Sequence, residues 1–387
     1  MPSLAPLLLI LYTTSYSQGA LPQMFSEAYI TVLEKNPNDR ASVGGYRPIS
    51  LLNTDYKILA KILVNKIQPH LHTIIHPNQY CSIPGRNIET LNHNIRDIIT
   101  YAHVKHIQVA LLSIDQEKAF DRVAHSYLFE VLRKCNLGTQ VEGWVRLLYQ
   151  APQSRLLVNQ ILTAPFPVQR SVRQGCPLSP LLYVLCIEPM LEMVRRDDNV
   201  HGLRIPGQEE IMKGVAYADD TTFMPTREKD ISNILLHFRT FEKACGAKIN
   251  LQKSAIMGLG KWRGKKTFSQ SLQVKTEMKL TGILCSNNPH TYNTKQYNDI
   301  LQHTDNTIHM YKHISHTIFG RSIIINTFIL PKLLYISTVC EPPPNFISKI
   351  HKKTWGFYFQ KHTTKHTPHY SYSNQKRRWH CITRLHI

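Results

Sequence analysis

The stretch Val215-Ala216-Tyr217-Ala218-Asp219-Asp220-Thr221-Thr222-Phe223-Met224 decides the fold of this chain. Apolar residues lie on both sides of two adjacent carboxylates, which is the pattern of two short strands joined by a tight turn. Asp219 and Asp220 would then stand at the tip of a hairpin, where oxygen ligands suit a divalent metal ion. An Asp-Asp turn between strands is also ordinary hairpin chemistry, so the motif alone does not establish a function.

A second acidic residue follows a longer apolar run upstream. The run Val109-Ala110-Leu111-Leu112-Ser113-Ile114 ends at Asp115, which predicts a buried strand that delivers Asp115 to its end. Nucleotidyl transfer uses two metal ions about 3.5–4 Å apart, and carboxylates from two strands are the expected ligands. We therefore predict Asp115, Asp219 and Asp220 as catalytic residues and metal ligands, with two Mg²⁺ ions as cofactor and Mn²⁺ as an alternative.

The charge of the chain favours a polyanionic partner. Lys and Arg number 46 against 26 Asp and Glu, for a formal net charge of +20 and a pI near 9.6. A basic, solvated surface would explain the charge alone almost as well. Carboxylates committed to apolar runs within such a cationic chain favour a polymerase.

These blocks occur in the order and spacing of the reverse transcriptases of non-LTR retrotransposons, and the chain resembles the LINE-1 type. The resemblance runs from about residue 20 to about residue 360. Further matching blocks are 46–53, 83–86, Asp115 to Asp121, Arg173 to Pro180, Lys248-Ile249-Asn250 with Lys253-Ser254, Gly320-Arg321 and Leu330 to Tyr335. The resemblance implies an α+β chain with the right-hand polymerase fold, in which an antiparallel palm sheet carries Asp115 and Asp219 on adjoining strands.

The domain boundaries expected from this resemblance divide the chain into four parts. An amino-terminal extension and the fingers take up 1–104, and the palm, with part of the fingers, takes up 105–290. A helical thumb follows over 291–362, in which Pro342-Pro343-Pro344 is a connector. The remaining residues, 363–387, form a basic tail.

The resemblance also implies contacts to the incoming nucleotide. Phe120 would lie under its sugar and exclude a 2′-hydroxyl, although a core aromatic after a strand is the alternative. Gln174 and Gly175 precede an apolar helix expected over 178–190 and would contact the nucleotide through backbone and side chain. The alternative for this pair is a simple turn before a buried helix.

Three cations would contact the phosphates. Arg47 precedes Pro48 and is therefore expected in an extended segment, where its guanidinium suits a triphosphate. Lys35 would assist it, but the chain departs from the family here, because relatives carry a Lys-Pro-Gly-Lys-Asp-like loop and this chain reads Glu-Lys-Asn-Pro-Asn-Asp at 34–39. Lys253 would lie near the leaving pyrophosphate as a general acid or a charge partner. An ordinary surface lysine is the alternative for that residue.

Periodicity predicts further elements. Helical spacing indicates amphipathic helices over 56–75 and 230–244. The inward stripe of the second is Ile231, Ile234, Leu235, Phe238 and Phe241. The segment 280–283 is expected to form a primer-gripping hairpin, although it lacks the aromatic that relatives have before the glycine.

Cysteine spacing and hydropathy bear on the compartment. The eight cysteines lack paired spacing, which indicates reduced intracellular thiols and argues against both a disulfide scaffold and a zinc knuckle. The apolar run 4–12 is too short to cross a bilayer and lacks signal-peptide flanks, so we expect a helix leading into the fingers. No later run is expected to reach membrane length. The resemblance implies a protein made in the cytoplasm that acts in the nucleus.

The end of the chain departs from the family. Relatives follow the thumb with a Gly-Gly-Leu-Ala-Leu-Pro-Asp-Phe-like block, whereas this chain reads Lys-Arg-Arg-Trp-His-Cys-Ile-Thr-Arg-Leu-His-Ile at 376–387. Back-translation with the frame shifted forward by one base permits Lys-Gly-Gly-Gly-Ile-Ala-Leu-Pro-Asp-Phe-Ile. We interpret the tail as out of frame, in a truncated element copy or a gene-model artefact. The encoding DNA tests this, because its shifted frame should spell the block and stay open.

The expected activity is that of an RNA-directed DNA polymerase. It would use an RNA template, a DNA primer or target DNA and deoxynucleoside triphosphates, with no membrane as partner. No segment resembles the endonuclease or the cysteine-rich region of such elements. The alternatives are a catalytically inactive nucleic-acid-binding remnant and a group II intron maturase, which would share the palm but not the block at 330–332.

Overall fold

The structure is a computed structural model that forms two compact units, Met1–Tyr292 and Asn293–Ile387. It describes residues 4–35, 42–207, 209–268, 270, 272–288, 292–314 and 317–359. The expected tail at 363–387, its histidines, Cys381 and most of the loop after Lys35 lie outside the described residues. Within the described residues, unit 1 is mixed helix and sheet, and unit 2 is helical.

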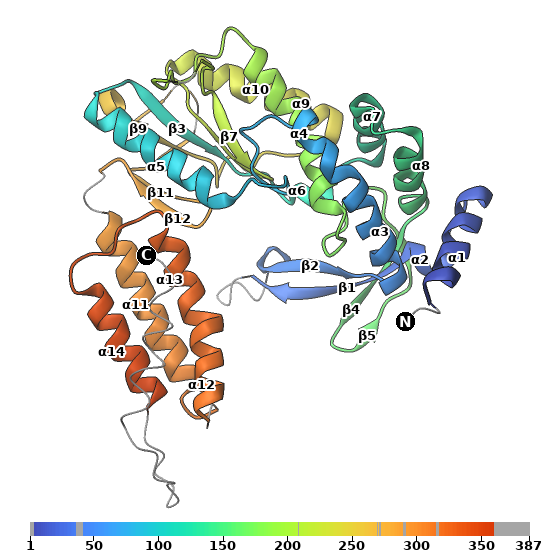
Figure 1. The fold of residues 1–387 in the computed structure, drawn as a ribbon. Helices are drawn as coiled ribbons and strands as arrows, with labels where there is room; N and C mark the ends of the chain where they lie inside the picture. Colours follow the sequence, from blue (N-terminus) through green and yellow to red (C-terminus); the bar gives the residue numbers. More distant parts are fainter. Residues whose placement is uncertain are drawn as a thin grey trace, which may run out of the picture. The chain divides into compact units, whose positions relative to one another are not determined.

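The central sheet of unit 1 has the strand order β10-β9-β3-β8-β7 (Figure 1). Its strands are β3 (Val109–Ile114), β7 (Gly214–Tyr217), β8 (Asp220–Phe223), β9 (Ala255–Leu259) and β10 (Gln273–Val274). β3 pairs antiparallel with both β8 and β9, and β7 pairs antiparallel with β8. This confirms the hairpin around Asp219, the buried strand before Asp115 and their placement on adjoining strands.

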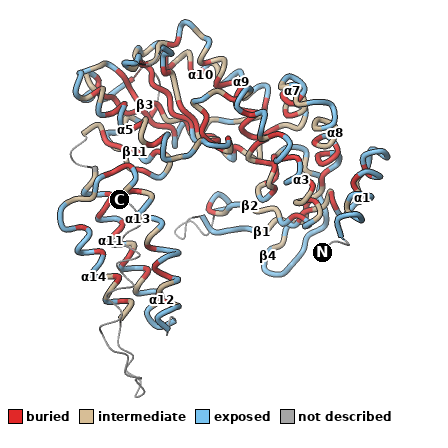
Figure 2. The backbone as a smooth tube through the Cα atoms, viewed as in Figure 1, coloured by how far each residue is buried: buried red, intermediate tan, exposed pale blue. Residues whose placement is uncertain are grey.

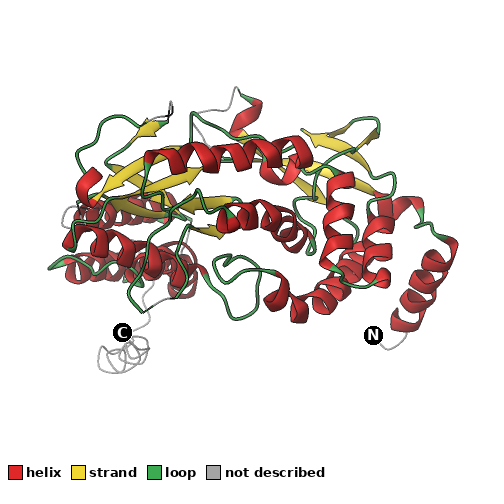
Figure 3. Ribbon diagram, turned by 90° about the horizontal axis from the view of Figure 1, so that it is seen from above, coloured by secondary structure: helices red, strands yellow, loops and turns green. Residues whose placement is uncertain are grey.

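Helices cover both faces of this sheet, as Figure 3 shows from above. They are α5 (Ile88–Val104) on one face, and α9 (Ser179–Arg196) and α10 (Glu228–Cys245) on the other. Ala110, Leu112 and Ile114 of β3 share one core with apolar residues of α9 and α10. Coverage of both faces explains why β3 reads as a continuous apolar run instead of an alternating one. Figure 2 shows this concentration of buried residues in the sheet and against it.

The helix predictions met with different outcomes. α10 confirms the helix over 230–244, and all five residues of its expected stripe are buried. The helix expected over 178–190 begins one residue later and continues through Pro189 to Arg196. The single helix expected over 56–75 is wrong, because Pro69 lacks an amide hydrogen and interrupts it. The segment divides into α3 (Thr54–Ile67), a 3₁₀ turn (Gln68–His70) and α4 (Leu71–Ile74).

A second sheet of unit 1 carries the expected fingers residues. Its order is β2-β1-β4-β5, with β6 beside β4. The strands are β1 (Glu27–Glu34), β2 (Tyr46–Leu51), β4 (Gln153–Val158), β5 (Ile161–Leu162) and β6 (Phe166–Pro167). Arg47 lies in β2 opposite Leu33, as an extended residue before a proline should. The apolar run near the amino terminus is a helix, α1 (Leu4–Gln18), as expected.

Short elements complete unit 1. They are α2 (Gln23–Ser26), the 3₁₀ turns Val43–Gly45 and Gly260–Trp262, α6 (Ala119–Arg122), α7 (His125–Cys135) and α8 (Thr139–Leu148). The hairpin expected at 280–283 is confirmed, because β11 (Glu277–Leu280) pairs with β12 (Ile283–Ser286). Its turn residues Thr281 and Gly282 have φ values of 45° and 91°, as a two-residue hairpin turn requires.

The described residues of unit 2 form helices, which is the secondary structure expected over this region. They are α11 (Tyr292–Tyr311), α12 (Ile318–Ile324), a π-helix (Ile325–Ile329), α13 (Leu330–Ser337) and α14 (Phe346–Tyr358). The three prolines at 342–344 lie between α13 and α14, as expected. Arg321, only 3% exposed, donates hydrogen bonds to the carbonyls of Phe357 and Tyr358 at 3.3 Å each. Its guanidinium therefore caps the carboxyl end of α14.

One helical run in unit 2 reaches membrane length. The stretch Ile318–Ser337 is long and apolar enough to cross a membrane by length and composition, and 28% of the apolar window within it is buried. The expectation that no later run approaches this length is therefore wrong. The reason is that α12, the π-helix and α13 follow one another without a break, although Pro331 lies among them. A single run of this kind is weak support for a membrane span.

Candidate active site

The turn between β7 and β8 holds the two adjacent aspartates. Tyr217 pairs with Asp220 across the hairpin, which leaves Ala218 and Asp219 as the turn residues. Ala218 has a φ of 55°, in the left-handed region that residues other than glycine seldom occupy. Asp219 is half-buried and Asp220 is exposed. The hairpin thus presents two carboxylates at one edge of the central sheet.

Asp115 immediately follows β3 and is fixed through its backbone. Its amide donates to Ser254 Oγ at 3.1 Å, and its carbonyl accepts from the amide of Asn250 at 2.8 Å. Ser254 Oγ in turn donates to the carbonyl of Asn250 at 2.8 Å. The loop between α10 and β9 therefore determines where Asp115 stands at the end of its strand.

The three carboxylates lie close enough to influence one another. Burial raises the pKa of Asp115. Burial also raises the pKa of Asp219, and the charge of Asp115 adds to that effect. Burial, followed by the charges of Asp219 and Asp115, raises the pKa of Asp220 to about 6. Part of the Asp220 side chain remains exposed to solvent. Negative charge is therefore concentrated at this edge of the sheet.

Three predicted cations act on the same carboxylates. Against the larger effect of burial, Lys253 and Lys35 lower the pKa of Asp115. Arg47 and Lys35 likewise lower the pKa of Asp219, again against a larger effect of burial. The cations come from three separate places, the end of β1, strand β2 and the turn before β9. The structure thus brings together six of the residues that the sequence singled out.

Phe120 lies in α6 and belongs to a small aromatic group. Its ring stacks on that of Tyr183 from α9, with 4.6 Å between ring centres and 10° between planes. The Tyr183 hydroxyl donates to Gln116 Oε1 at 3.1 Å. Burial and then the charge of Asp219 raise the pKa of Tyr183, which places this group beside the carboxylates. Phe120 itself is only half-buried, so one side of its ring is not taken up by the core.

Gln174 and Gly175 join the site through β2. The Ser50 amide donates to the Gln174 carbonyl at 2.7 Å. Gly175 has a φ of 111°, and a Cβ there would come within 2.5 Å of the Ser50 carbonyl oxygen. Close approach to β2 therefore requires glycine, whether or not a nucleotide is bound. This contact supports the alternative given for Gln174 and Gly175, a simple turn before a buried helix.

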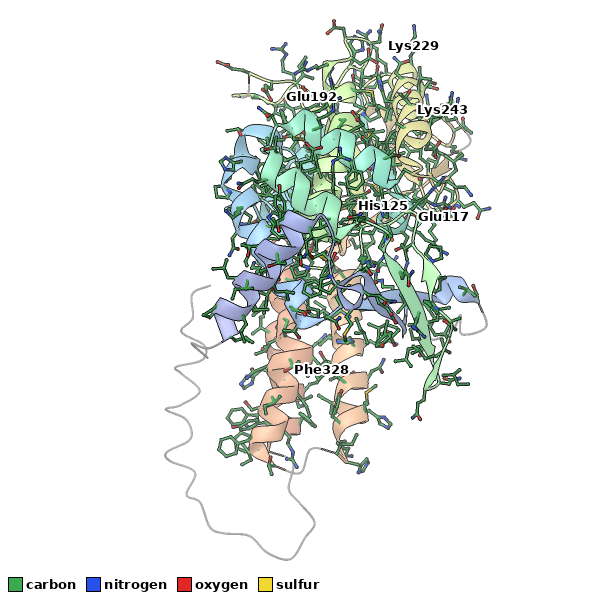
Figure 4. All side chains as sticks on the ribbon, turned by 90° about the vertical axis from the view of Figure 1, so that its right-hand side faces the viewer. Glu117, His125, Glu192, Lys229, Lys243 and Phe328 are labelled. Carbon is green, nitrogen blue, oxygen red and sulfur yellow. The ribbon has the colours of Figure 1, made fainter. Side chains whose placement is uncertain are left out.

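The loop after Asp115 is anchored by Glu117, which is labelled in Figure 4. Its amide donates to the Lys248 carbonyl at 2.8 Å. Its carboxylate pairs with Arg122 at 2.9 Å and with Lys248 at 3.1 Å. The Glu117 carboxylate is thus paired with two cations, and its side chain stabilises the loop.

Sequence reasoning missed several residues that support the site. Gln79 accepts a hydrogen bond from the Ala218 amide, and Ser254 accepts one from Asp115. Gln116 is the acceptor for Tyr183. Each of these contacts joins residues far apart along the chain, so periodicity carries no signal of them. Ser254 and Gln116 lie inside quoted blocks, and Gln79 lies four residues before one.

The donor set suits a hard divalent cation. Among the described residues, no group of three or more His, Cys, Asp and Glu side chains is arranged to hold a metal ion alone. Mg²⁺ is commonly held by one or two carboxylates together with water and substrate phosphates, without a complete protein cage. Carboxylates that raise one another's pKa fit this role, because a cation would offset their repulsion.

Comparison with known proteins points to one family. Residues 33–285 match the family model described as "Reverse transcriptase (RNA-dependent DNA polymerase)". The chain is 30% identical over 350 residues, 89% of its length, to an uncharacterized 149 kDa protein of transposon TX1 from Xenopus laevis. It is 26% identical over 211 residues, 54% of its length, to a Pol polyprotein of the retrotransposable element R2 from Nasonia vitripennis. It spans 26% and 20% of these two relatives.

A solved telomerase from Candida tropicalis, in complex with an RNA fragment, is also similar in structure. The identity is 11% and the TM-score is 0.49, over 90% of this chain and 60% of that one. A likeness at this level carries no argument about activity.

Proposed function

Since this chain belongs to the reverse transcriptase family, with 33–285 as its matched region, we propose that it adds deoxynucleotides to a primer 3′-hydroxyl on an RNA template. Its relatives include non-LTR retrotransposon proteins, and its type is the LINE-like one that the motifs indicated. Its fold is the α+β right-hand polymerase fold. The family is described as an RNA-dependent DNA polymerase. That this chain itself has polymerase activity is what we propose.

The observation that carries this proposal is the meeting of three carboxylates and three cations at one sheet edge. Asp115 and Asp219 come from adjoining strands, and the charge of Asp115 adds to the effect of burial in raising the pKa of Asp219. Nucleotidyl transfer needs both kinds of charge, because the phosphates are anionic and the metal ions that accompany them are cationic. A carboxylate held in a salt bridge usually has a lowered pKa, whereas burial raises the pKa of all three carboxylates here.

Each group then has a proposed role. Asp115, Asp219 and Asp220 would hold two divalent ions, Mg²⁺ or in its place Mn²⁺. When bound, these ions supply activation of the attacking hydroxyl and charge neutralisation at the leaving group. Arg47 and Lys35 would bind the triphosphate. Lys253 would neutralise the departing pyrophosphate or donate a proton to it.

Selection of the sugar is proposed for Phe120. Its stacking on Tyr183 leaves the ring little freedom to move aside. A fixed ring under the sugar would collide with a 2′-hydroxyl, so the polymerase should use deoxynucleotides and refuse ribonucleotides. Gln174 would contact the nucleotide from the turn that docks on β2, with Gly175 permitting that docking.

The proposed partners follow from charge and from the family. A net charge of +20 favours an RNA template with a DNA primer or target DNA, and deoxynucleoside triphosphates as substrates. The division into fingers at 1–104, palm at 105–290 and thumb at 291–362 also belongs to this proposal. We also propose that the protein is synthesised in the cytoplasm and acts in the nucleus.

Primer extension tests the proposed function. Purified protein is supplied with Mg²⁺, deoxythymidine triphosphate and an oligo(dT) primer on poly(rA). The matched control is the double variant Asp219→Asn with Asp220→Asn. We expect extension by the unsubstituted protein, and in the double variant loss of extension with duplex binding retained.

The competing account is a remnant that binds nucleic acid without catalysis. It predicts folded protein that binds the duplex, no extension by the unsubstituted chain, and no difference between that chain and the double variant. This result would overturn the proposed polymerase activity.

A further inference from the structure

The turn that carries Asp219 stands in a conformation that needs support. Ala218 precedes Asp219 and has a φ of 55°. For a residue with a Cβ, this region is strained relative to ordinary backbone. Such a conformation persists only where the surroundings fix it. The contacts of the Ala218 peptide therefore decide how Asp219 is presented.

One side chain from a distant segment holds that peptide. The Ala218 amide donates to Gln79 Oε1 at 3.1 Å, and the Cys81 amide donates to the same oxygen at 3.1 Å. Gln79 has no exposed surface. Its Nε2 is buried without a hydrogen-bond partner, which is unfavourable. The side-chain amide of Gln79 therefore stabilises the turn through its oxygen atom.

The segment around Gln79 also extends the central sheet. Gln79 forms a parallel bridge to Ala216 of β7. The Ala216 amide donates to the Asn78 carbonyl, and the Tyr80 amide donates to the Ala216 carbonyl, both at 2.9 Å. The open edge of β7 is thus covered next to the turn. These backbone hydrogen bonds fix the position of Gln79 along β7. Its side chain therefore reaches the hairpin at the Ala218 peptide.

Arg86 holds this segment from the other side. Its guanidinium donates to the carbonyls of Ile75 at 3.0 Å, His76 at 2.6 Å and Gln79 at 2.8 Å. A planar, fixed fork of donors suits three carbonyls on one loop. Arg86 therefore fixes the backbone from which Gln79 reaches the turn. This gives the block at 83–86 a physical explanation within the described residues.

We propose that Gln79 is a positioning residue for the turn, and that its amide oxygen sets the direction in which Asp219 faces Asp115. Arg86 acts one step further out, through the carbonyl of Gln79. The inference rests on the proposed polymerase function, because it concerns the same carboxylates. Residues that orient metal ligands through hydrogen bonds commonly change metal affinity or activity by about 10–100-fold when they are replaced.

The test compares Gln79→Met with Tyr80→Phe. Methionine keeps the length of the side chain and removes the acceptor. Tyr80 is a neighbour in the same segment, and its hydroxyl accepts a hydrogen bond from Asn94 Nδ2 at 2.7 Å, away from the turn. Gln79→Met removes the acceptor of two buried backbone amides, and Tyr80→Phe removes the acceptor of one part-buried side-chain amide. Because both readouts are taken on folded protein, a merely structural role predicts similar effects of the two variants on them. The readouts are Mn²⁺ affinity by calorimetry, and the rate of primer extension at saturating duplex and nucleotide, below the melting temperature of each variant.

We expect Gln79→Met to weaken Mn²⁺ binding and slow extension by about tenfold or more. The KM for the nucleotide should change little, and Tyr80→Phe should match the unsubstituted protein in both readouts. Equal effects of the two variants would overturn the inference. If Gln79→Met does not fold, Arg86→Lys is measured instead. It retains one cationic donor group in place of the fork, so it should weaken Mn²⁺ binding in the same direction, and an unchanged affinity would overturn the inference.

Calorimetry separates this inference from the proposed function. Unsubstituted protein that binds Mn²⁺ without extending a primer would remove the polymerase proposal, while the comparison of affinities would still decide the role of Gln79. Protein that neither binds Mn²⁺ nor extends a primer would overturn both.

Discussion

Asp220 shows the electrostatic character of the site at the scale of one residue. Burial, followed by the charges of Asp219 and Asp115, raises its pKa to about 6. A carboxyl whose pKa is raised in the folded state binds protons more tightly there than in the unfolded chain. Its charge therefore costs stability above about pH 6, and the cost disappears as the pH falls towards the ordinary carboxyl value near 4. A bound cation would remove the same cost at neutral pH.

Replacing Asp220 by Asn is expected to stabilise the metal-free protein at pH 7.5. The gain should be about 1 kcal/mol or less, because Asp220 is exposed and solvent screens its charge. At pH 4 the difference should vanish, since the native carboxyl is then protonated. Urea unfolding in the presence of a chelator, at both pH values, measures this. A variant less stable than the native protein at pH 7.5 would contradict the electrostatic account.

The three aspartates could be predicted because each stands directly beside an apolar run. Gln79 could not, because its contact with Ala218 spans 139 residues of sequence. The same holds for Ser254, whose hydroxyl meets Asp115 across 139 residues. A side chain that acts through one long-range hydrogen bond has no local pattern. It becomes visible only when the fold brings the two segments together.

At the scale of elements, strands and helices followed their periodicity except where a proline decided otherwise. The helix expected over 56–75 breaks at Pro69, whereas α9 continues through Pro189. Both prolines lack an amide hydrogen, but the core around α9 is more extensively buried, with 12 of its 18 residues enclosed. Tertiary packing thus decides whether each of these prolines ends its helix. The sequence alone did not show which of the two helices would be interrupted.

The turn at 173–176 depends on a glycine at its closest approach to β2. Gly175→Ala should destabilise unit 1 by about 3 kcal/mol, because it combines a strained φ with a clash against the Ser50 carbonyl. Gly85→Ala is the matched control. Gly85 also has a positive φ, 74°, but nothing lies within 4 Å of its Cβ position. That variant should lose about 1 kcal/mol. Denaturant unfolding compares them, and equal losses would show that the approach to β2 is not limiting.

At the scale of the whole molecule, the composition and the ordered blocks were enough to indicate the family and the fold. The net charge of +20 and the spacing from Asp115 to Asp219 pointed to a polymerase, and the family match over 33–285 agrees. The separation at residue 292 into two compact units was not visible as a change in composition. The apolar run at 318–337 reaches membrane length because α12, the π-helix and α13 form one continuous helical stretch.

The central claim is that Asp115 belongs to a nucleotidyl-transfer centre, and it is tested most directly against a neighbouring carboxylate. Asp115→Asn and Glu117→Gln each remove one negative charge from the same loop, but the Glu117 carboxylate pairs with Arg122 and Lys248. The measurement is the single-turnover rate of primer extension on an RNA template with Mg²⁺. We expect Asp115→Asn to lower this rate by at least about 100-fold, while Glu117→Gln changes it by less than about threefold. Comparable rates for the two variants would contradict the account.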